Sequence, residues 1–334
     1  MQKRKIGQTD LAVDVLGIGG APFGGNFAEI GRAEAIEALD VAFDAGLTYV
    51  DTAPFYGFGR SERVIGDFLR DKPYVISTKV GRLLVPGHAP DPMAYGMIEP
   101  LPFHPVYDYT YDGIMRSFVA SQHRLGLDRI DMLLVHDIGE FQHGAQDNAR
   151  HFADLKNGGY RVLDELRASG QVKAIGLGVN ENEVCQAALE IGQWDVFLLA
   201  GRYTVLEQTA LDALFPACAA AGTSIICGGP FNSGVLVGRE MWNYAKAPVD
   251  VVERVKKLKS VAEDNAVSLP AAALQFPLAH PIVSCVIPGS RSADEFRQIL
   301  AWTQAEIPAQ FWSDLQSAGL LHNDAPLPQG NPYA

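Results

Sequence analysis

Short apolar runs alternate along the chain with longer amphipathic stretches. The short runs are apolar on both faces and rich in β-branched residues, which predicts the buried strands of a parallel sheet. These predicted strands cover residues 15–18, 47–50, 74–78, 130–135, 172–178, 196–199, 224–227 and 283–287. The amphipathic stretches predict helices over residues 32–45, 61–70, 111–125, 160–168, 181–191, 207–221, 249–265, 270–278 and 293–302.

This alternation predicts an α/β fold, namely a closed (β/α)₈ TIM barrel formed by residues 1–334 as a single domain. An N-terminal β-hairpin is expected within residues 4–16, around the Gln8-Thr9-Asp10 turn. A doubly wound open sheet is the alternative, and it normally carries a Gly-x-Gly-x-x-Gly turn after its first strand. Here Pro22 falls where the phosphate-binding helix of that turn would run, so the barrel is favoured.

Three connections are longer than barrel loops need to be, at residues 81–110, 137–159 and 228–248. They are predicted to be long loops at the C-terminal rim, where such loops shape a pocket or a lid. For the polar, His-rich segment 137–159, irregular surface decoration is the alternative. The Pro-rich stretch 326–332 is expected to be irregular and to lie over the barrel.

Composition narrows the class of protein. The 334 residues carry a net charge of −12, which disfavours binding to nucleic acid or anionic membranes. No apolar run approaches the roughly 20 residues of a membrane span, and no signal peptide is recognised. Four scattered cysteines without a Cys-x-x-Cys pair predict a reduced, cytoplasmic protein. We expect a small-molecule enzyme that is a monomer or a small homo-oligomer.

Four side chains that can do chemistry follow neighbouring predicted strands. Asp51 and Tyr56 follow the second strand, Lys79 the third and His136 the fourth. The pKa of a Tyr hydroxyl is near 10, and it must fall by about three units before the hydroxyl can exchange protons near neutrality. One ammonium ~4 Å away supplies about 4 kcal/mol at an effective dielectric constant of ~20. Lys79, held by Asp51, is therefore expected to activate Tyr56, while His136 donates a hydrogen bond to a substrate oxygen.

A phenol and an imidazole exchange protons but supply no hydride, so a nicotinamide must provide it. Taken singly, each residue also has an ordinary structural role, such as a turn aspartate or a buried core histidine. Their joint appearance at three successive strand ends favours a site. A metal-dependent hydrolase using His136, Asp137, His143 and His151 is the competing interpretation. The last three lie within one insertion rather than at separate strand ends, so no metal is predicted.

The segments 4–20 and 45–57 resemble the N-terminal hairpin and the most specific signature of the aldo-keto reductase superfamily. The catalytic Asp, Tyr, Lys and His of that family fall on Asp51, Tyr56, Lys79 and His136. The resemblance implies a (β/α)₈ barrel with NAD(P) bound across its rim. It also implies hydride transfer with Tyr56 as general acid/base.

The resemblance also implies cofactor contacts. Asn180 matches the residue that holds the carboxamide, and Ala200 and Gly228 stand where many members have Gln and a stacking Tyr. The full implied cofactor set is Gly20, Asp51, Asn180, Gly229, Phe231, Ser233, Pro288, Gly289, Ser290, Arg291 and Gln298. Implied substrate contacts are Phe23, Phe55, Tyr56 and His136. NADP-specific members usually have Lys where Gly289 stands, so NAD is expected, with NADP as the alternative.

Within that family, residues 159–167 and 202–208 resemble the aldose 1-dehydrogenase branch, which includes L-fucose, D-threo-aldose and L-galactose dehydrogenases. A pyridoxal 4-dehydrogenase is similar. The implied reaction oxidises the anomeric hydroxyl of an aldose to a lactone. Oxidation of pyridoxal and general reduction of aldehydes or ketones are the alternatives, and a non-catalytic, cofactor-sensing subunit is a further one.

Overall fold

The computed structural model describes all 334 residues and contains one eight-stranded parallel sheet, in the order β14-β11-β10-β9-β8-β5-β4-β3. Two parallel bridges, Leu16 to Val286 and Gly19 to Gly289, join the outer strands and close the sheet. The predicted (β/α)₈ barrel is thereby confirmed. Its strands are β3 (Ile18–Gly19), β4 (Tyr49–Asp51), β5 (Val75–Val80), β8 (Met132–His136), β9 (Ala174–Val179), β10 (Val196–Ala200), β11 (Ser224–Gly228) and β14 (Val283–Ile287).

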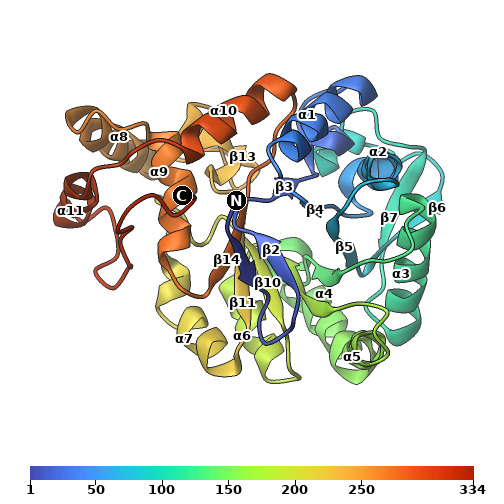
Figure 1. Ribbon diagram of the computed structural model, residues 1–334. Helices are drawn as coiled ribbons and strands as arrows, with labels where there is room; N and C mark the ends of the chain where they lie inside the picture. Colours follow the sequence, from blue (N-terminus) through green and yellow to red (C-terminus); the bar gives the residue numbers. More distant parts are fainter.

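Helices surround the barrel on its outside (Figure 1). They are α1 (Arg32–Asp44), α2 (Arg60–Leu69), α3 (Tyr111–Leu125), α4 (Glu140–Asp154), α5 (Tyr160–Ala168), α6 (Asn182–Leu189), α7 (Leu214–Ala221), α8 (Val249–Asp264), α9 (Leu269–Gln275), α10 (Ala293–Thr303) and α11 (Ala309–Ser317). Most boundaries fall within one or two residues of those predicted from the amphipathic pattern. No helix is both long enough and apolar enough to cross a membrane.

The core has two layers, one between the sheet and the helices and one inside the barrel. The predicted hairpin forms from β1 (Lys3–Lys5) and β2 (Ala12–Asp14). Its Ile6, Leu11 and Val13 join the inner cluster formed by inward-facing strand residues such as Met132 and Leu134. The hairpin therefore packs against the barrel interior, and the C-terminal ends of the strands are left to the loops that follow them.

None of the three long connections is a plain loop. Segment 81–110 is a hairpin of β6 (Arg82–Pro86) and β7 (Phe103–Tyr107) rather than a plain loop. Segment 137–159 contains α4, broken at Gly144 where φ is +70°, and is not irregular. The ring centroid of His143, in this segment, lies 4.7 Å from that of Tyr107, so the segment is packed against the hairpin. The prediction failed because histidines of this segment, which pack against tyrosines from outside it, stand where an amphipathic helix usually has aliphatic side chains.

The third connection holds a short hairpin of β12 (Met241–Trp242) and β13 (Ala245–Lys246). The predicted helix 207–221 is helical only from Leu214, after a 3₁₀ turn at Thr209–Leu211. Pro216 lacks an N–H and so fits only in the first turn of a helix, which explains the later start. Helix α11 was not predicted, and residues 318–334 after it contain no helix or strand.

Candidate active site

The barrel brings the four predicted catalytic residues to one end of three adjacent strands. Asp51 ends β4, Lys79 lies near the end of β5, and His136 ends β8. Tyr56 opens a 3₁₀ turn just after β4, at Tyr56–Gly59. Because β4, β5 and β8 are neighbours in the sheet, residues distant in sequence converge on one point.

Lys79 is almost fully buried, and its ammonium group is saturated with acceptors. It donates to both carboxylate oxygens of Asp51, at 2.9 and 2.7 Å, and to the carbonyl oxygen of Thr52 at 2.9 Å. An ammonium has three N–H donors, so none remains for the hydroxyl of Tyr56. The ammonium nevertheless lies 5.0 Å from the centroid of the Tyr56 ring.

The electrostatics of Tyr56 differ from the prediction. Burial, followed by the carboxylates of Asp51 and Asp137, raises the pKa of Tyr56 well above its usual value. The guanidinium of Arg82 opposes this shift. The expectation that Lys79 alone brings the pKa toward neutrality is wrong for the free protein, because Asp51 balances the ammonium charge. Tyr56 is therefore a neutral phenol here, ready to donate a proton.

His136 faces the same phenol. Its ring lies edge-on to Tyr56, with centroids 5.7 Å apart and an interplanar angle of 89°. Burial, then the cations of Arg82 and Lys79, lowers the pKa of His136 well below its usual value. Its backbone carbonyl accepts a hydrogen bond from the Tyr109 hydroxyl at 2.8 Å. A neutral imidazole in this place can donate one N–H to a substrate oxygen.

Two cavities meet at Tyr56. One measures about 440 Å³ and extends from the β3 end toward α10, and we call it the cofactor lobe. The other measures about 360 Å³ and contains His136, and we call it the substrate lobe. Tyr56 lines both, together with Ala21 and Ala200. A group bound in either lobe would thus lie beside the phenol.

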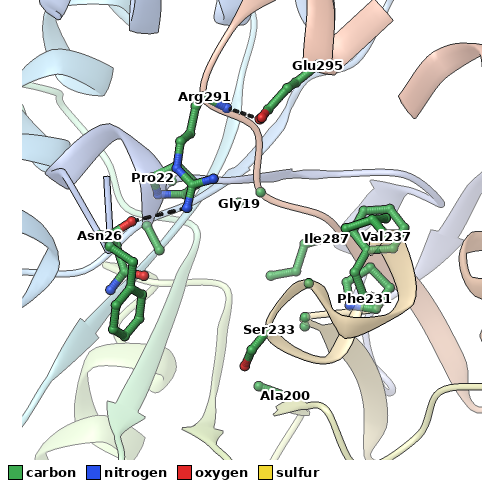
Figure 2. A pocket seen from close by; sticks show the side chains of 18 of the residues that line it. Gly19, Pro22, Asn26, Ala200, Phe231, Ser233, Val237, Ile287, Arg291 and Glu295 are labelled. Carbon is green, nitrogen blue, oxygen red and sulfur yellow. Dashed lines mark hydrogen bonds between the residues drawn. The ribbon is translucent and has the colours of Figure 1, made fainter. Parts of the chain in front are cut away.

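Most residues expected to contact the cofactor line the first lobe (Figure 2). They are Gly20, Asp51, Gly229, Phe231, Ser233, Gly289, Arg291 and Gln298. Gly229 has φ +56°, and a Cβ added there would meet no atom closer than 3.9 Å, so a ligand can approach its backbone. Pro288 and Ser290 do not line the lobe, and the Ser290 hydroxyl donates to the Ser292 carbonyl at 3.1 Å.

The far end of the cofactor lobe combines two arginines with a carboxylate. Glu295 accepts the backbone N–H of Arg291 at 2.8 Å and the guanidinium of Arg239 at 3.2 Å. Arg291 also reaches the carbonyl oxygen of Asn26, at 3.4 Å, as Figure 2 shows. The buried Nε of Arg291 has no partner. This extended lobe, with glycine backbone and a free guanidinium N–H, fits a dinucleotide.

The substrate lobe holds Phe55, Tyr56 and His136, as expected, but not Phe23. Phe23 lies in the hydrophobic core and lines neither lobe. Asn180 lines the substrate lobe, where its amide N–H₂ donates to Asp137 at 3.0 Å. Its amide oxygen accepts the hydroxyl of Tyr244 at 3.0 Å.

Sequence reasoning assigned none of Arg82, Asp137 and Tyr244 to the substrate site, although all three line the substrate lobe. Arg82 follows Lys79 by three positions and Asp137 follows His136 directly, so proximity to strand ends was the available signal for both. Tyr244 comes from the 228–248 connection and stacks on Phe27, with centroids 6.2 Å apart. No sequence pattern identifies that long-range stack.

Comparisons with known proteins agree with this geometry. The model of the Aldo/keto reductase family matches residues 15–319. The chain is 43% identical to a pyridoxal 4-dehydrogenase from Microbacterium luteolum, over 96% of this chain and 98% of that protein. It is 38% identical to a D-threo-aldose 1-dehydrogenase from a Pseudomonas species, over 93% and 95% of the two chains. The holo form of an aldo-keto reductase from Bacillus halodurans superposes with a TM-score of 0.73 at 22% identity, covering 98% of both chains.

Proposed function

This chain belongs to the aldo/keto reductase family of NAD(P)-dependent oxidoreductases, and from that premise we propose that it oxidises a cyclic hemiacetal to a lactone with NAD⁺. The observation that carries the proposal is the meeting of the two lobes at Tyr56, beside His136. The names of the two most identical relatives given above support the substrate class. An aldose closes to a cyclic hemiacetal, and pyridoxal, whose aldehyde lies beside a hydroxymethyl group, can do the same.

Oxidation of such a hydroxyl removes a hydride from carbon and a proton from oxygen, and a C=O bond forms. A nicotinamide bound in the cofactor lobe would supply the hydride acceptor. Tyr56, once deprotonated, takes the hydroxyl proton on its phenolic oxygen. His136 donates an N–H to the same substrate oxygen and fixes its orientation. In the reverse direction the neutral phenol of Tyr56 gives its proton to a carbonyl oxygen.

The choice of NAD⁺ over NADP⁺ rests on the far end of the cofactor lobe. A 2′-phosphate carries up to two negative charges and needs free cationic partners. Glu295 pairs with the guanidinium of Arg239, accepts the backbone N–H of Arg291, and lines the lobe itself. A carboxylate in this position repels a phosphate and can accept a ribose hydroxyl.

The first experiment follows reduced-nicotinamide absorbance with NAD⁺ or NADP⁺ against L-fucose, L-galactose, D-arabinose and pyridoxal. Reduction with any of the four substrates supports the proposal and identifies the cofactor. Absence of reduction with all four, despite measured cofactor binding, contradicts it.

Tyr56→Phe tests the residue that the mechanism depends on. We expect turnover to fall at least about 10³-fold, because general acid/base catalysis and the oriented proton acceptor are lost together. Cofactor affinity, measured by calorimetry, should stay within about threefold. The control is Tyr203→Phe, which removes a buried hydroxyl that has no partner and lines neither lobe. Near-normal turnover in Tyr56→Phe would refute the mechanism.

A further inference from the structure

Arg82 is a buried cation that the proton transfer just described does not use. Its side chain is 1% exposed, although it lines the substrate lobe. Only its Nη2 atom is engaged, by Asp137 at 2.6 Å and by Gln142 at 3.0 Å. Its Nε and Nη1 atoms have no hydrogen-bond partner. Unpaired donors on a buried cation are costly, so a ligand that accepts from them would be bound strongly.

The position of Arg82 places its guanidinium group beside His136. Asp137 Oδ2 accepts from Arg82, and the same oxygen lies 3.5 Å from Nε2 of His136. The guanidinium carbon also lies 4.2 Å from the centroid of Phe55, whose ring meets His136 edge-on. Arg82 and His136 therefore share one carboxylate oxygen and one aromatic neighbour within the substrate lobe.

Other polar groups near Tyr56 are already committed. The three donors of Lys79 are taken by Asp51 and Thr52. The amide of Asn180 is paired at both ends, with Asp137 and with Tyr244. If His136 serves the reacting oxygen, Arg82 is the charged donor left for a second substrate oxygen close to the first.

We propose that Arg82 selects the substrate by binding an oxygen next to the hydroxyl that is oxidised, with Asp137 holding the guanidinium in place. This inference rests on the proposed function and narrows its substrate class to cyclic hemiacetals with a second oxygen beside the reacting one. The 2-hydroxyl of an aldose meets this requirement, and so does the 3-oxygen of pyridoxal. Arg82 thus provides one recognition chemistry for both kinds of molecule.

Removing that oxygen from the substrate leaves the guanidinium unpaired in a closed site. A hydrogen bond to a charged group has a free energy that corresponds to a change of about 10- to 100-fold in kcat/KM. A site built to bond a substrate oxygen rejects the analogue that lacks it for this reason. The loss of kcat/KM for the analogue without the oxygen should depend on Arg82, and it should disappear when the planar guanidinium donors are removed.

The test compares wild type and Arg82→Lys on matched substrates. One pair is D-arabinose and 2-deoxy-D-erythro-pentose, which is D-arabinose without its 2-hydroxyl. The other pair is pyridoxal and 3-deoxypyridoxal, and the more responsive pair identifies the source of the oxygen. Lysine keeps a positive charge for Asp137 but lacks the planar fork. We expect kcat/KM to fall about 10- to 100-fold in wild type on loss of the oxygen, and less than about threefold in Arg82→Lys.

Three results would overturn the inference. The inference is overturned by wild type alone if the two members of each pair have equal kcat/KM. An equal loss for both members in Arg82→Lys, with a shifted alkaline limb of the pH profile, would mean that Arg82 acts through Tyr56. The same response in the control Arg167→Lys, whose guanidinium pairs with Asp164 and Asp195 away from both lobes, would show a general effect. If wild type oxidises none of these compounds and neither L-fucose nor L-galactose, the proposed function itself has failed.

Discussion

Charge balance around one phenol decides how this site can act. The carboxylates of Asp51 and Asp137 raise the pKa of Tyr56, and burial raises it most. Arg82 is the cation that lowers it, because Lys79 is bound on all three donors by Asp51 and Thr52. In the free protein Tyr56 is therefore ready to act as an acid, and it must lose a proton before it can act as a base.

This balance sets the pH dependence. We expect kcat/KM for hemiacetal oxidation to rise with pH well into the alkaline range, because only the ionised phenol can accept the hydroxyl proton. Reduction of an aldehyde with reduced cofactor should fall over the same range. No limb is expected near pH 6.5, since the pKa of His136 lies well below its usual value. Rate profiles in both directions between pH 5 and 10 measure this, and an oxidation limb that levels off below pH 7 would contradict it.

A second prediction at this scale concerns the choice of cofactor. Glu295→Gln removes the negative charge that pairs with the guanidinium of Arg239 and accepts the backbone N–H of Arg291. We expect the ratio of kcat/KM for NADP⁺ to that for NAD⁺ to rise by about tenfold, which corresponds to roughly 1.4 kcal/mol. The matched control is Asp294→Asn, which neutralises the neighbouring exposed carboxylate that pairs with Arg297. An unchanged ratio in Glu295→Gln, or an equal rise in the control, would show that Glu295 does not discriminate.

Among the elements, helix α4 shows why the pattern of hydrophobic residues does not predict every helix near the candidate site. Polar histidine rings make part of its contact with the rest of the protein, beside the hydrophobic Phe152. His143 Nε2 lies 3.0 Å from the Tyr109 hydroxyl, and the ring of His151 lies 4.6 Å from that of His143. Tyr109 in turn donates to the His136 carbonyl. The helix therefore supports His136 through one tyrosine.

This packing makes the helix sensitive to acid. Burial, then His151 and Arg82, lowers the pKa of His143 to about 4. In the unfolded chain the histidine pKa is near 6.5. Between about pH 6.5 and 4 His143 is therefore protonated in the unfolded chain but not in the folded chain. Stability is therefore expected to fall as the pH is lowered from about 6.5 toward 4. His143→Gln should reduce the difference between the unfolding temperatures at pH 7.5 and pH 5.

The control for this effect is His123→Gln, which changes an exposed histidine on α3. It should leave the difference between the two unfolding temperatures unchanged. If both variants behave like wild type, the acid sensitivity of the protein arises elsewhere.

For the molecule as a whole, the sequence predicts the barrel and the place of its site, because both follow from local pattern. Eight apolar runs predict strands, and polar residues at their ends predict where Asp51, Lys79 and His136 converge. Contacts between segments that are far apart in the sequence cannot be predicted from a local pattern of residues. Phe23 and Phe55 are both aromatic residues after strands, yet only Phe55 faces the cleft. The saturation of Lys79 likewise depends on three-dimensional distances that no spacing reveals.

The C-terminal tail is another such long-range feature. The tail was expected to lie irregularly over the barrel, yet Tyr333 is only 4% exposed and belongs to the main core. Its hydroxyl donates to the Leu274 carbonyl of α9 at 2.9 Å. Asn331 bonds the carbonyl of Thr303 in α10, and Gln2 bonds the carbonyl of Ala334. Figure 1 shows the two termini beside each other near these helices.

We therefore expect Tyr333→Ala to lower the free energy of unfolding by about 3 kcal/mol, the usual cost of removing a buried aromatic ring. Tyr333→Phe keeps the ring and loses one hydrogen bond, so it should cost about 1 kcal/mol. Denaturant unfolding measures both values. Neither variant should change kcat/KM at a temperature where both are folded, because Tyr333 lines neither lobe. Equal stability of wild type and Tyr333→Ala would mean that the tail only covers the barrel and does not help to hold α9 and α10 in place.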